Sequence, residues 1–231
     1  MASIYLIPNL LGESPLSVLS PQVAQAVQEL TYFVVENEKS ARKFIKLIAP
    51  EKPQSELQIN VIDKHQSTPD YAAYITPCLQ GHSIGIISEA GCPGVADPGA
   101  EIVRVAHQKA LRVIPLVGPS SLLLAMMSSG LNGQNFAFNG YLPIDKQVRR
   151  KTLKVLERKV QEGQSQLFIE TPYRNQQLLS DLIETLQPDT LLCIATDLTL
   201  PTESIRTLPI RQWKHTSVDL QKRPTLFIIG R

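Results

Sequence analysis

Ser88-Glu89-Ala90-Gly91-Cys92-Pro93-Gly94-Val95-Ala96-Asp97-Pro98-Gly99 is the stretch of sequence from which the fold can be inferred. It follows a short apolar run at residues 84–87. It precedes residues 102–106, where apolar side chains recur with helical spacing. These patterns predict a buried strand, a loop rich in glycine and proline, and then a helix.

The loop is longer than a connection between a strand and a helix requires, since such connections usually take about two to six residues. Glycine lacks a Cβ, so a ligand can approach its backbone, and proline stiffens the chain. In open α/β sheets, ligands bind outside the carboxyl ends of the strands. We therefore favour a ligand-binding loop over a simple connector.

The whole chain alternates short apolar runs with helical patterns, which indicates an α/β protein with a mainly parallel sheet. The sequence predicts two α/β domains of similar size, residues 1–116 and 117–231, with a cofactor cleft between them. We expect strands at residues 4–7, 32–35, 58–62, 83–88, 112–116, 136–141, 166–170, 191–197, 204–208 and 225–229.

Helix ends are marked by cap residues. Ser20-Pro21 and Thr68-Pro69 each place a cap residue before a proline in the first helical position. Gly81 is expected to close the second of these helices in a left-handed conformation. Gly130 is expected to end an apolar helix, and a long polar helix is predicted from about residue 145 to 162.

Composition excludes several classes of protein. The formal net charge of the 231 residues is +2, which is too small by itself to indicate a nucleic-acid partner. The three cysteines are widely spaced and the four histidines lack metal-ligand spacing, so we expect no structural disulfide and no metal. No apolar run approaches the length of a membrane span, and we expect a soluble cytoplasmic protein.

The predicted ligand is a nucleoside-like molecule without a phosphate chain. Neither G-x-G-x-x-G nor G-x-x-x-x-G-K-[ST] occurs, and no lysine follows the glycines of residues 88–99 to hold a phosphate.

Five motifs in a fixed order are shared with a known family: residues 88–93 with 97–99, Val-Gly-Pro-Ser-Ser at 117–121, residues 129–131 with 136–143, Glu-Thr-Pro-Tyr-Arg at 170–174, and Asp-Leu-Thr at 197–199 with Glu203. Through them, essentially the full chain resembles the tetrapyrrole methylase-like (class III) S-adenosylmethionine-dependent methyltransferases. It is most similar to the branch that 2′-O-methylates a cytidine of small-subunit ribosomal RNA.

The resemblance implies a homodimer of two-domain subunits that bind S-adenosylmethionine in the interdomain cleft. By position, the implied donor contacts are Pro8, Ser88, Glu89, Ala90, Gly91, Cys92, Pro93, Ser120, Ser121, Tyr141, Leu142, Pro224 and Thr225. Ser120 and Ser121 can also cap the apolar helix that follows them.

The chain departs from the rRNA branch in its first loop, which reads Pro-Asn-Leu-Leu-Gly-Glu-Ser at residues 8–14, and at Leu200, where the branch has lysine. Three functions therefore stay open. They are methylation of rRNA, methylation of a tetrapyrrole or other small molecule, and a non-catalytic role in binding the donor or RNA.

Transfer of a methyl group to a ribose hydroxyl is helped by a nearby base that removes the proton. Carboxylates at the ends of predicted strands are the candidates, namely Glu36, Asp97, Asp197 and Glu203. For Asp97 we favour a turn, in which the carboxylate bonds to nearby backbone amides.

Two clusters of basic residues indicate an anionic partner. Four cations recur every fourth residue in the long polar helix, where Val148, Val155, Leu156 and Val160 are expected to form the apolar face. The candidate RNA contacts are Lys146, Arg149, Arg150, Lys154 and Arg158 in this helix, and Lys39, Arg42 and Lys43 in an earlier one. Phosphates of RNA and carboxylates of a tetrapyrrole both fit this charge.

Overall fold

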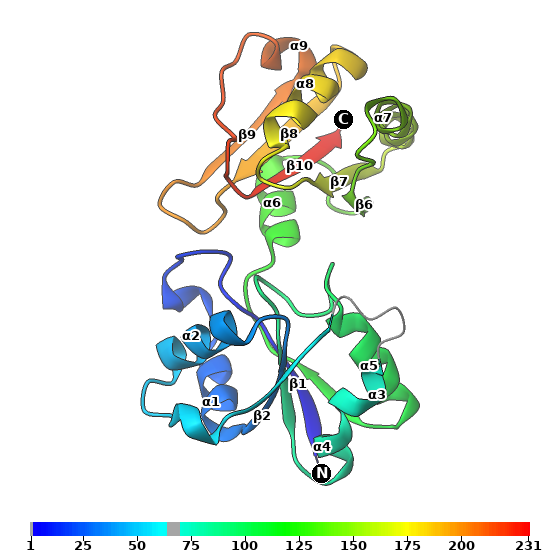
Figure 1. Ribbon diagram of the computed structural model, residues 1–231. Coiled ribbons are helices and arrows are strands. Elements are labelled where there is room, and N and C mark those ends of the chain that lie inside the picture. Colours follow the sequence, from blue (N-terminus) through cyan, green and yellow to red (C-terminus); the bar gives the residue numbers. More distant parts are fainter. Residues whose placement is uncertain (1, 64–69) are drawn as a thin grey trace. The chain divides into compact units, whose positions relative to one another are not determined.

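The computed structural model describes residues 2–63 and 70–231 (Figure 1). The chain divides into two compact units, Met1–Ser120 and Ser121–Arg231. The boundary expected between residues 116 and 117 falls in the segment that joins the last strand of the first unit to the first helix of the second. The helix start expected at Thr68-Pro69 lies outside the described residues.

The N-terminal unit contains a sheet in which every pair of neighbouring strands is parallel, as predicted. Its order is β3-β2-β4-β1-β5. The strands are β1 (Ser3–Ile7), β2 (Tyr32–Val35), β3 (Gln58–Val61), β4 (Ile84–Ile87) and β5 (Arg112–Pro115). All of β4 is buried, because strands lie on both of its sides and helices cover both faces of the sheet.

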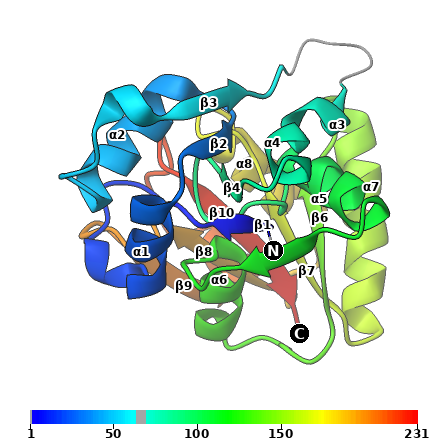
Figure 2. The same ribbon diagram turned by 90° about the horizontal axis from the view of Figure 1, so that it is seen from below.

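Helices pack on both faces of this sheet (Figure 2). One apolar cluster joins the sheet to α1 (Pro21–Glu29) and α2 (Glu38–Ile48), and the other joins it to α3 (Tyr71–Tyr74), α4 (Thr76–Leu79) and α5 (Gly99–Gln108). Two short 3-10 turns, η1 (Leu16–Val18) and η2 (Gln54–Glu56), complete the unit. The carboxyl ends of β1, β2 and β4 are thereby held close together at one edge of the sheet.

Gly85 lies in the middle of β4 because the packing leaves no room for a side chain. A Cβ at this position would lie 2.6 Å from Cδ1 of Ile7 and 3.0 Å from Cδ1 of Phe33. The absence of a side chain lets these two large residues fill the core of the sheet.

The C-terminal unit contains a mixed sheet in the order β6-β7-β10-β8-β9. The strands are β6 (Phe136–Tyr141), β7 (Ser165–Ile169), β8 (Leu191–Thr196), β9 (Ser204–Pro209) and β10 (Thr225–Gly230). Only β6 and β7 are parallel, so the expectation of a mainly parallel sheet is wrong for this half. The loop between β8 and β9 contains no helix, and two strands joined so directly pair antiparallel.

The core of the C-terminal unit is built by α7 (Lys146–Gln161), α8 (Asn175–Thr185) and α9 (Ile210–Trp213) against the sheet. A further helix, α6 (Ser121–Ser129), contacts β8, β9 and β10. In α7 the buried residues are Arg149, Leu153, Leu156, Glu157 and Val160.

The apolar face expected for α7 is wrong in part. Val148 is 48% exposed and Val155 is 43% exposed, whereas Leu153 is fully buried. Arg149 lies in the interior instead, in a buried ion pair between α7 and α8 that is described below. The helix therefore turns the two valines outward.

Three of the expected helix ends are found. Ser20 precedes Pro21 at the start of α1, although its hydroxyl makes no capping hydrogen bond. Gly81, just after α4, has φ +95°, and Gly130, just after α6, has φ +71°. Both are left-handed conformations that glycine adopts without strain.

The packing of α7 predicts unequal effects of two truncations on the same helix. Leu153→Ala should lower the free energy of unfolding of the C-terminal unit by about 2–5 kcal/mol, because it leaves a cavity. Val155→Ala should change it by less than about 1 kcal/mol, because that side chain is exposed. Urea unfolding followed by fluorescence of Trp213, the one tryptophan of the sequence, reports on this unit. Equal effects of the two variants would contradict this assignment of the helix faces.

Candidate functional site

Asn9, the second residue after β1, holds the glycine-rich loop that follows β4. Its Nδ2 donates to the carbonyl oxygens of Ser88 at 2.9 Å and Glu89 at 3.3 Å. Its main-chain N–H donates to the carbonyl of Gly91 at 2.9 Å, and the N–H of Gly91 donates back at 3.1 Å. The Ser88 hydroxyl also donates to the Gly91 carbonyl at 2.7 Å. We call these bonds the Asn9 network; they fix the bend at residues 88–91.

The second half of the loop is a turn organised by Asp97. Its Oδ1 accepts hydrogen bonds from the N–H groups of Gly94 at 2.7 Å and Gly99 at 2.8 Å. This arrangement confirms the turn that we favoured for Asp97. Gly91, Gly94 and Ala96 have φ of +67°, +81° and +60°, so the loop follows a path that ordinary residues rarely take.

Loops after three strands of the N-terminal unit meet at this bend. A Cβ built on Gly91 would lie 3.1 Å from Leu11 and 3.4 Å from the carbonyl oxygen of Pro119. A Cβ on Gly118 would lie 2.3 Å from Pro8. The structure therefore brings the predicted donor contacts Pro8 and 88–93 together in one unit. Of the serines predicted beside them, Ser120 ends this unit and Ser121 begins α6.

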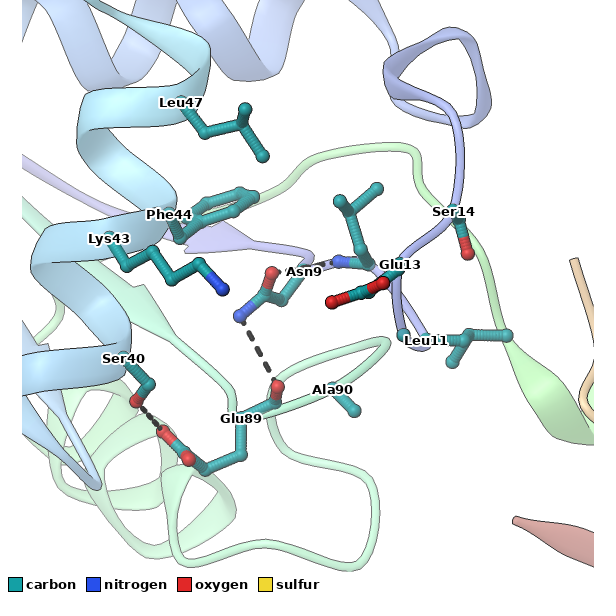
Figure 3. A pocket seen from close by; sticks show the side chains of 12 residues that line it. Asn9, Leu11, Glu13, Ser14, Ser40, Lys43, Phe44, Leu47, Glu89 and Ala90 are labelled. Atoms are coloured by element: carbon teal, nitrogen blue, oxygen red, sulfur yellow. Dashed lines mark hydrogen bonds between the residues drawn. The ribbon is translucent and has the colours of Figure 1, made fainter. Parts of the chain in front are cut away.

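A pocket of about 390 Å³ opens beside the bend (Figure 3). We call it the Phe44 pocket. Its lining comes from the first loop, from α2 and from the glycine-rich loop, and consists of Asn9, Leu10, Leu11, Gly12, Glu13, Ser14, Ser40, Lys43, Phe44, Leu47, Glu89 and Ala90. Of the predicted donor contacts, Glu89 and Ala90 reach it. Its volume falls in the range of small-molecule sites.

Apolar and polar groups are segregated in the Phe44 pocket. Leu10 and Phe44 are buried, and Leu47 is half-exposed beside them. The polar groups include the ammonium of Lys43 and the carboxylates of Glu13 and Glu89. Oε1 of Glu89 accepts a hydrogen bond from the Ser40 hydroxyl at 2.6 Å, which orients this carboxylate.

The predicted donor contacts of the C-terminal unit lie at one end of its sheet. Tyr141 pairs in register with Ile169 on β7, and Ile169 pairs with Leu226 on β10, next to Pro224 and Thr225. Tyr141 is exposed, but the side chain of Leu142 is packed in the hydrophobic core. A donor could therefore contact Leu142 only through its backbone.

The remaining carboxylate candidates are held in local interactions. Glu36 follows β2 and is half-buried. Asp197 is 6% exposed; its Oδ2 accepts hydrogen bonds from Nε of Arg223 at 2.8 Å and from the Thr202 hydroxyl at 2.7 Å. Glu203 accepts from the N–H of Thr199 at 2.7 Å. These bonds give Asp197 and Glu203 structural roles in the loop between β8 and β9.

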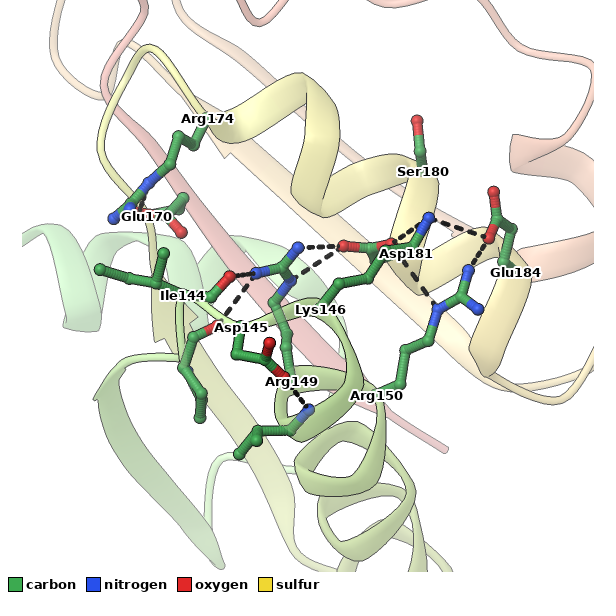
Figure 4. Close-up of polar contacts among 12 residues, drawn as sticks. Ile144, Asp145, Lys146, Arg149, Arg150, Glu170, Arg174, Ser180, Asp181 and Glu184 are labelled. Atoms are coloured by element: carbon green, nitrogen blue, oxygen red, sulfur yellow. Dashed lines mark hydrogen bonds and ion pairs between the residues drawn. The ribbon is translucent and has the colours of Figure 1, made fainter.

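Three of the five cations expected to bind RNA on α7 are paired with α8 (Figure 4). Arg149 is 6% exposed, and its Nε donates to Oδ2 of the buried Asp181 at 2.9 Å. Its Nη1 also donates to the carbonyls of Pro143 and Ile144. Arg150 pairs with Glu184, and Nζ of Lys146 lies 3.6 Å from Oδ1 of Asp181. Arg149 is thus a structural residue. Fewer cations of α7 are free to bind RNA than the sequence of this helix alone suggested.

Lys154 and Arg158 remain exposed on the outer face of α7, with Lys151 beside them. Among the described residues, no carboxylate lies within ion-pair distance of Lys154 or Arg158. In α2, Arg42 pairs with Glu38 at 2.8 Å and donates to the carbonyl of Gln54, Lys39 is exposed, and Lys43 lines the Phe44 pocket.

The described part of the chain contains no group of three or more His, Cys, Asp or Glu side chains placed to hold a metal ion. No helix within it is both long enough and apolar enough to span a bilayer.

Sequence reasoning missed Asn9, Glu13 and Phe44. Asn9 and Glu13 stand in the first loop, where the chain departs from the family pattern, and we took this departure only as a reason to leave the function open. Phe44 follows the apolar spacing of α2 and looks like an ordinary core residue. Its place beside a pocket depends on loops distant in sequence, which periodicity does not report.

No family model matches the chain. Its sequence is similar to proteins named ribosomal RNA small subunit methyltransferase I. The protein of Pseudomonas aeruginosa is 26% identical over 194 residues, which cover 84% of this chain and 66% of the relative. That of Synechocystis is 28% identical over 199 residues, covering 86% and 68%. The chain thus spans about two thirds of the length of these relatives.

Solved structures share the fold. The methyltransferase CobJ superposes with a TM-score of 0.66 at 17% identity, covering all of this chain and 95% of that one. A uroporphyrin III C-methyltransferase from Thermus thermophilus gives a TM-score of 0.60 at 15% identity, covering 100% and 98%. Together these similarities confirm the predicted resemblance to the tetrapyrrole methylase-like methyltransferases and the α/β fold that it implied.

Cys92 supplies a pH test of the loop. Burial raises the pKa of the Cys92 thiol above its usual value, and the sulfur lies 3.5 Å from the carbonyl oxygen of Pro119. Since the thiolate is the reactive form, iodoacetamide should alkylate Cys92 more slowly in the folded chain than in urea at about pH 8. The difference between the two alkylation rates should narrow as the pH rises above the raised pKa of Cys92. Peptide mass spectrometry measures the two alkylation rates; equal rates at every pH would contradict the partly buried position of Cys92.

Proposed function

We propose that this chain, a protein with the tetrapyrrole methylase fold, transfers the methyl group of S-adenosylmethionine to a ribose 2′-hydroxyl of small-subunit ribosomal RNA. One observation carries the proposal: the similarity to rRNA small subunit methyltransferase I extends over 84–86% of the chain in the two relatives compared above. The solved structures, CobJ and the uroporphyrin III C-methyltransferases, are similar in fold at 14–17% identity, so they argue for the architecture alone.

The bend at residues 88–93 has the properties that a sulfonium nucleoside requires. Gly91 and Gly94 have the positive φ values that the sharp bend needs, and the Asn9 network holds the loop in one conformation before a ligand arrives. A Cβ on Gly91 would crowd Leu11 and the Pro119 carbonyl. We assign donor contacts to Pro8, Ser88–Pro93 and Ser120 in this unit, and to Ser121, Tyr141, Pro224, Thr225 and the backbone of Leu142 in the other.

When bound, the donor supplies an electrophilic methyl group, and transfer forms a carbon–oxygen bond as the carbon–sulfur bond breaks. The protein then has two tasks. It aligns the hydroxyl oxygen with the methyl carbon, and it accepts the hydroxyl proton. Rigid loops at the strand ends serve the first task. For the second, Glu13 and Glu89 line the pocket next to the bend, whereas Asp97 and Asp197 are engaged in turns and ion pairs.

RNA would bind through the exposed cations. On the outer face of α7 these are Lys151, Lys154 and Arg158, and on α2 they are Lys39 and Lys43. Phosphates of RNA are recognised by such side chains without regard to sequence, so this surface would position the RNA.

We also propose that two copies of the chain form a homodimer and that the protein works in the cytoplasm. Leu123 and Met127 of α6 are 56% and 79% exposed, and exposed apolar side chains of this size favour an interface. Cys78, Cys92 and Cys193 are free thiols, as expected in a reducing compartment. Sedimentation of a mass equal to two chains supports the dimer, and a single-chain mass contradicts it.

The proposed activity predicts one missing modification in a strain that lacks the gene. Its small-subunit rRNA, digested and compared by mass with that of the parent strain, should lose one methyl group at one nucleotide. Complementation with the intact gene should restore it. Unchanged RNA in the deletion strain would refute the proposed substrate and favour a small-molecule acceptor.

The exposed cations of α7 predict a change in salt dependence. Lys154→Ala with Arg158→Ala should weaken binding to purified small-subunit rRNA and reduce the slope of log affinity against log salt by about two. The control, Arg211→Ala with Lys214→Ala, likewise removes one arginine and one lysine from exposed positions of the same unit. It should leave the slope nearly unchanged. Filter binding across a salt series measures both. Equal slopes for the two double variants would show that the RNA does not bind at the exposed cations of α7.

A further inference from the structure

The Phe44 pocket is not explained by donor binding alone. Of the implied donor contacts, only Glu89 and Ala90 reach it, at its edge nearest the glycine-rich loop. The rest of its wall comes from the first loop and α2, in which no donor contact beyond Pro8 is implied (Figure 3). An additional ligand group therefore has a place beside the donor loop.

One wall of the pocket is apolar and suits the face of a flat ring. Its apolar wall is formed by Leu10, Leu11, Phe44 and Leu47, and its volume is about 390 Å³. Single-stranded RNA is recognised by proteins that take up unstacked bases against apolar and aromatic side chains. Enzymes that act on a nucleotide within RNA or DNA commonly extrude it into such a pocket.

The polar groups of the pocket limit which base it would accept. The ionised carboxylates of Glu13 and Glu89 can only accept hydrogen bonds. Cytosine, adenine and guanine each carry an exocyclic amino group that donates, whereas uracil does not. Two carboxylates against the single ammonium of Lys43 also disfavour a ligand with several carboxylates.

Lys43 favours a nucleotide over a free nucleoside. Its ammonium reaches the pocket, and it makes no ion pair with a carboxylate among the described residues. The neighbouring cation Arg42, by contrast, is held by Glu38 at 2.8 Å. An ammonium free at the edge of an apolar site suits the phosphate that accompanies an extruded base.

We propose that the Phe44 pocket binds a nucleobase that carries an exocyclic amino group, and that this base belongs to the acceptor nucleotide of the RNA. The inference rests on the function proposed above, because it names the part of the RNA that enters beside the donor loop. The adenine of the donor has the same chemistry, so the experiment separates the two sources.

The test uses the full chain labelled with ¹³C in its leucine methyl groups. Cytidine 5′-monophosphate should shift the resonances of Leu11 and Leu47, since a stacked base changes the magnetic environment of nearby methyl groups. Ribose 5-phosphate, which lacks a base, should not. Uridine 5′-monophosphate should bind about tenfold more weakly, because it has a carbonyl oxygen where cytosine offers its amino group to the carboxylates. Glu13→Gln with Glu89→Gln should reduce this preference.

A matched pair of variants locates the site. Leu47→Glu places a charge in the pocket and should weaken binding of cytidine 5′-monophosphate at least about tenfold. Leu79→Glu, at a position that is 53% exposed in the same unit but outside the pocket, should not change it; Leu47 is 50% exposed. Equal effects of the two variants would overturn the proposal.

S-Adenosylhomocysteine, titrated separately, identifies the source of the base. Shifts at Leu47 with the monophosphate and not with S-adenosylhomocysteine support an acceptor pocket. The reverse pattern overturns the acceptor role and assigns the pocket to the donor. If neither ligand shifts Leu47, the base pocket is refuted. The proposed methylation then still stands or falls by the rRNA mass comparison, which does not depend on this result.

Discussion

The hydrogen bonds of Asn9 to the loop after β4 are the interaction on which the candidate site depends. Asn9 lies two residues beyond β1, and β1 and β4 are adjacent parallel strands, so their carboxyl ends meet at the same edge of the sheet. A single side chain thereby satisfies the carbonyls of Ser88 and Glu89, while its backbone pairs with Gly91. Without these bonds, a loop with several glycines would sample many conformations, and ordering it would oppose ligand binding.

The same network shapes the Phe44 pocket. Residues 10–14 continue from Asn9 and form one wall, and Glu89 and Ala90 form another. The hydrogen bond from Ser40 to Glu89 then connects the glycine-rich loop to α2. A glycine-rich bend suited to a nucleoside and a pocket suited to a base are therefore built from the same few residues, which is why we place donor and acceptor chemistry side by side.

The sequence predicted the fold well because its signals were local. Every predicted strand of the N-terminal unit is found, since short apolar runs between helices leave few alternatives. The mixed sheet of the C-terminal unit was missed because strand direction depends on how β8, β9 and β10 are connected. The basic stripe on α7 was overestimated for a similar reason. Its neutralising carboxylates, Asp181 and Glu184, come from another helix.

The site was predictable only where a motif marked it. Residues 88–99 carried enough glycine and proline to indicate a ligand loop, and Asp97 was correctly interpreted as a turn. Asn9 and Phe44 gave no such signal, because an asparagine in a loop and a phenylalanine in a helix are common. Their roles arise from contacts between segments separated by about 80 and 45 residues, which only the folded chain reveals.

Calorimetric titration with S-adenosylhomocysteine tests most directly whether the Asn9-held bend is the donor site. The intact chain should bind this product. Asn9→Asp removes the two amide hydrogen bonds to the loop and should weaken binding about tenfold or more, whereas the same change at the exposed Asn60 should have little effect. Absence of binding to the intact chain, or equal affinity in Asn9→Asp, would contradict the account.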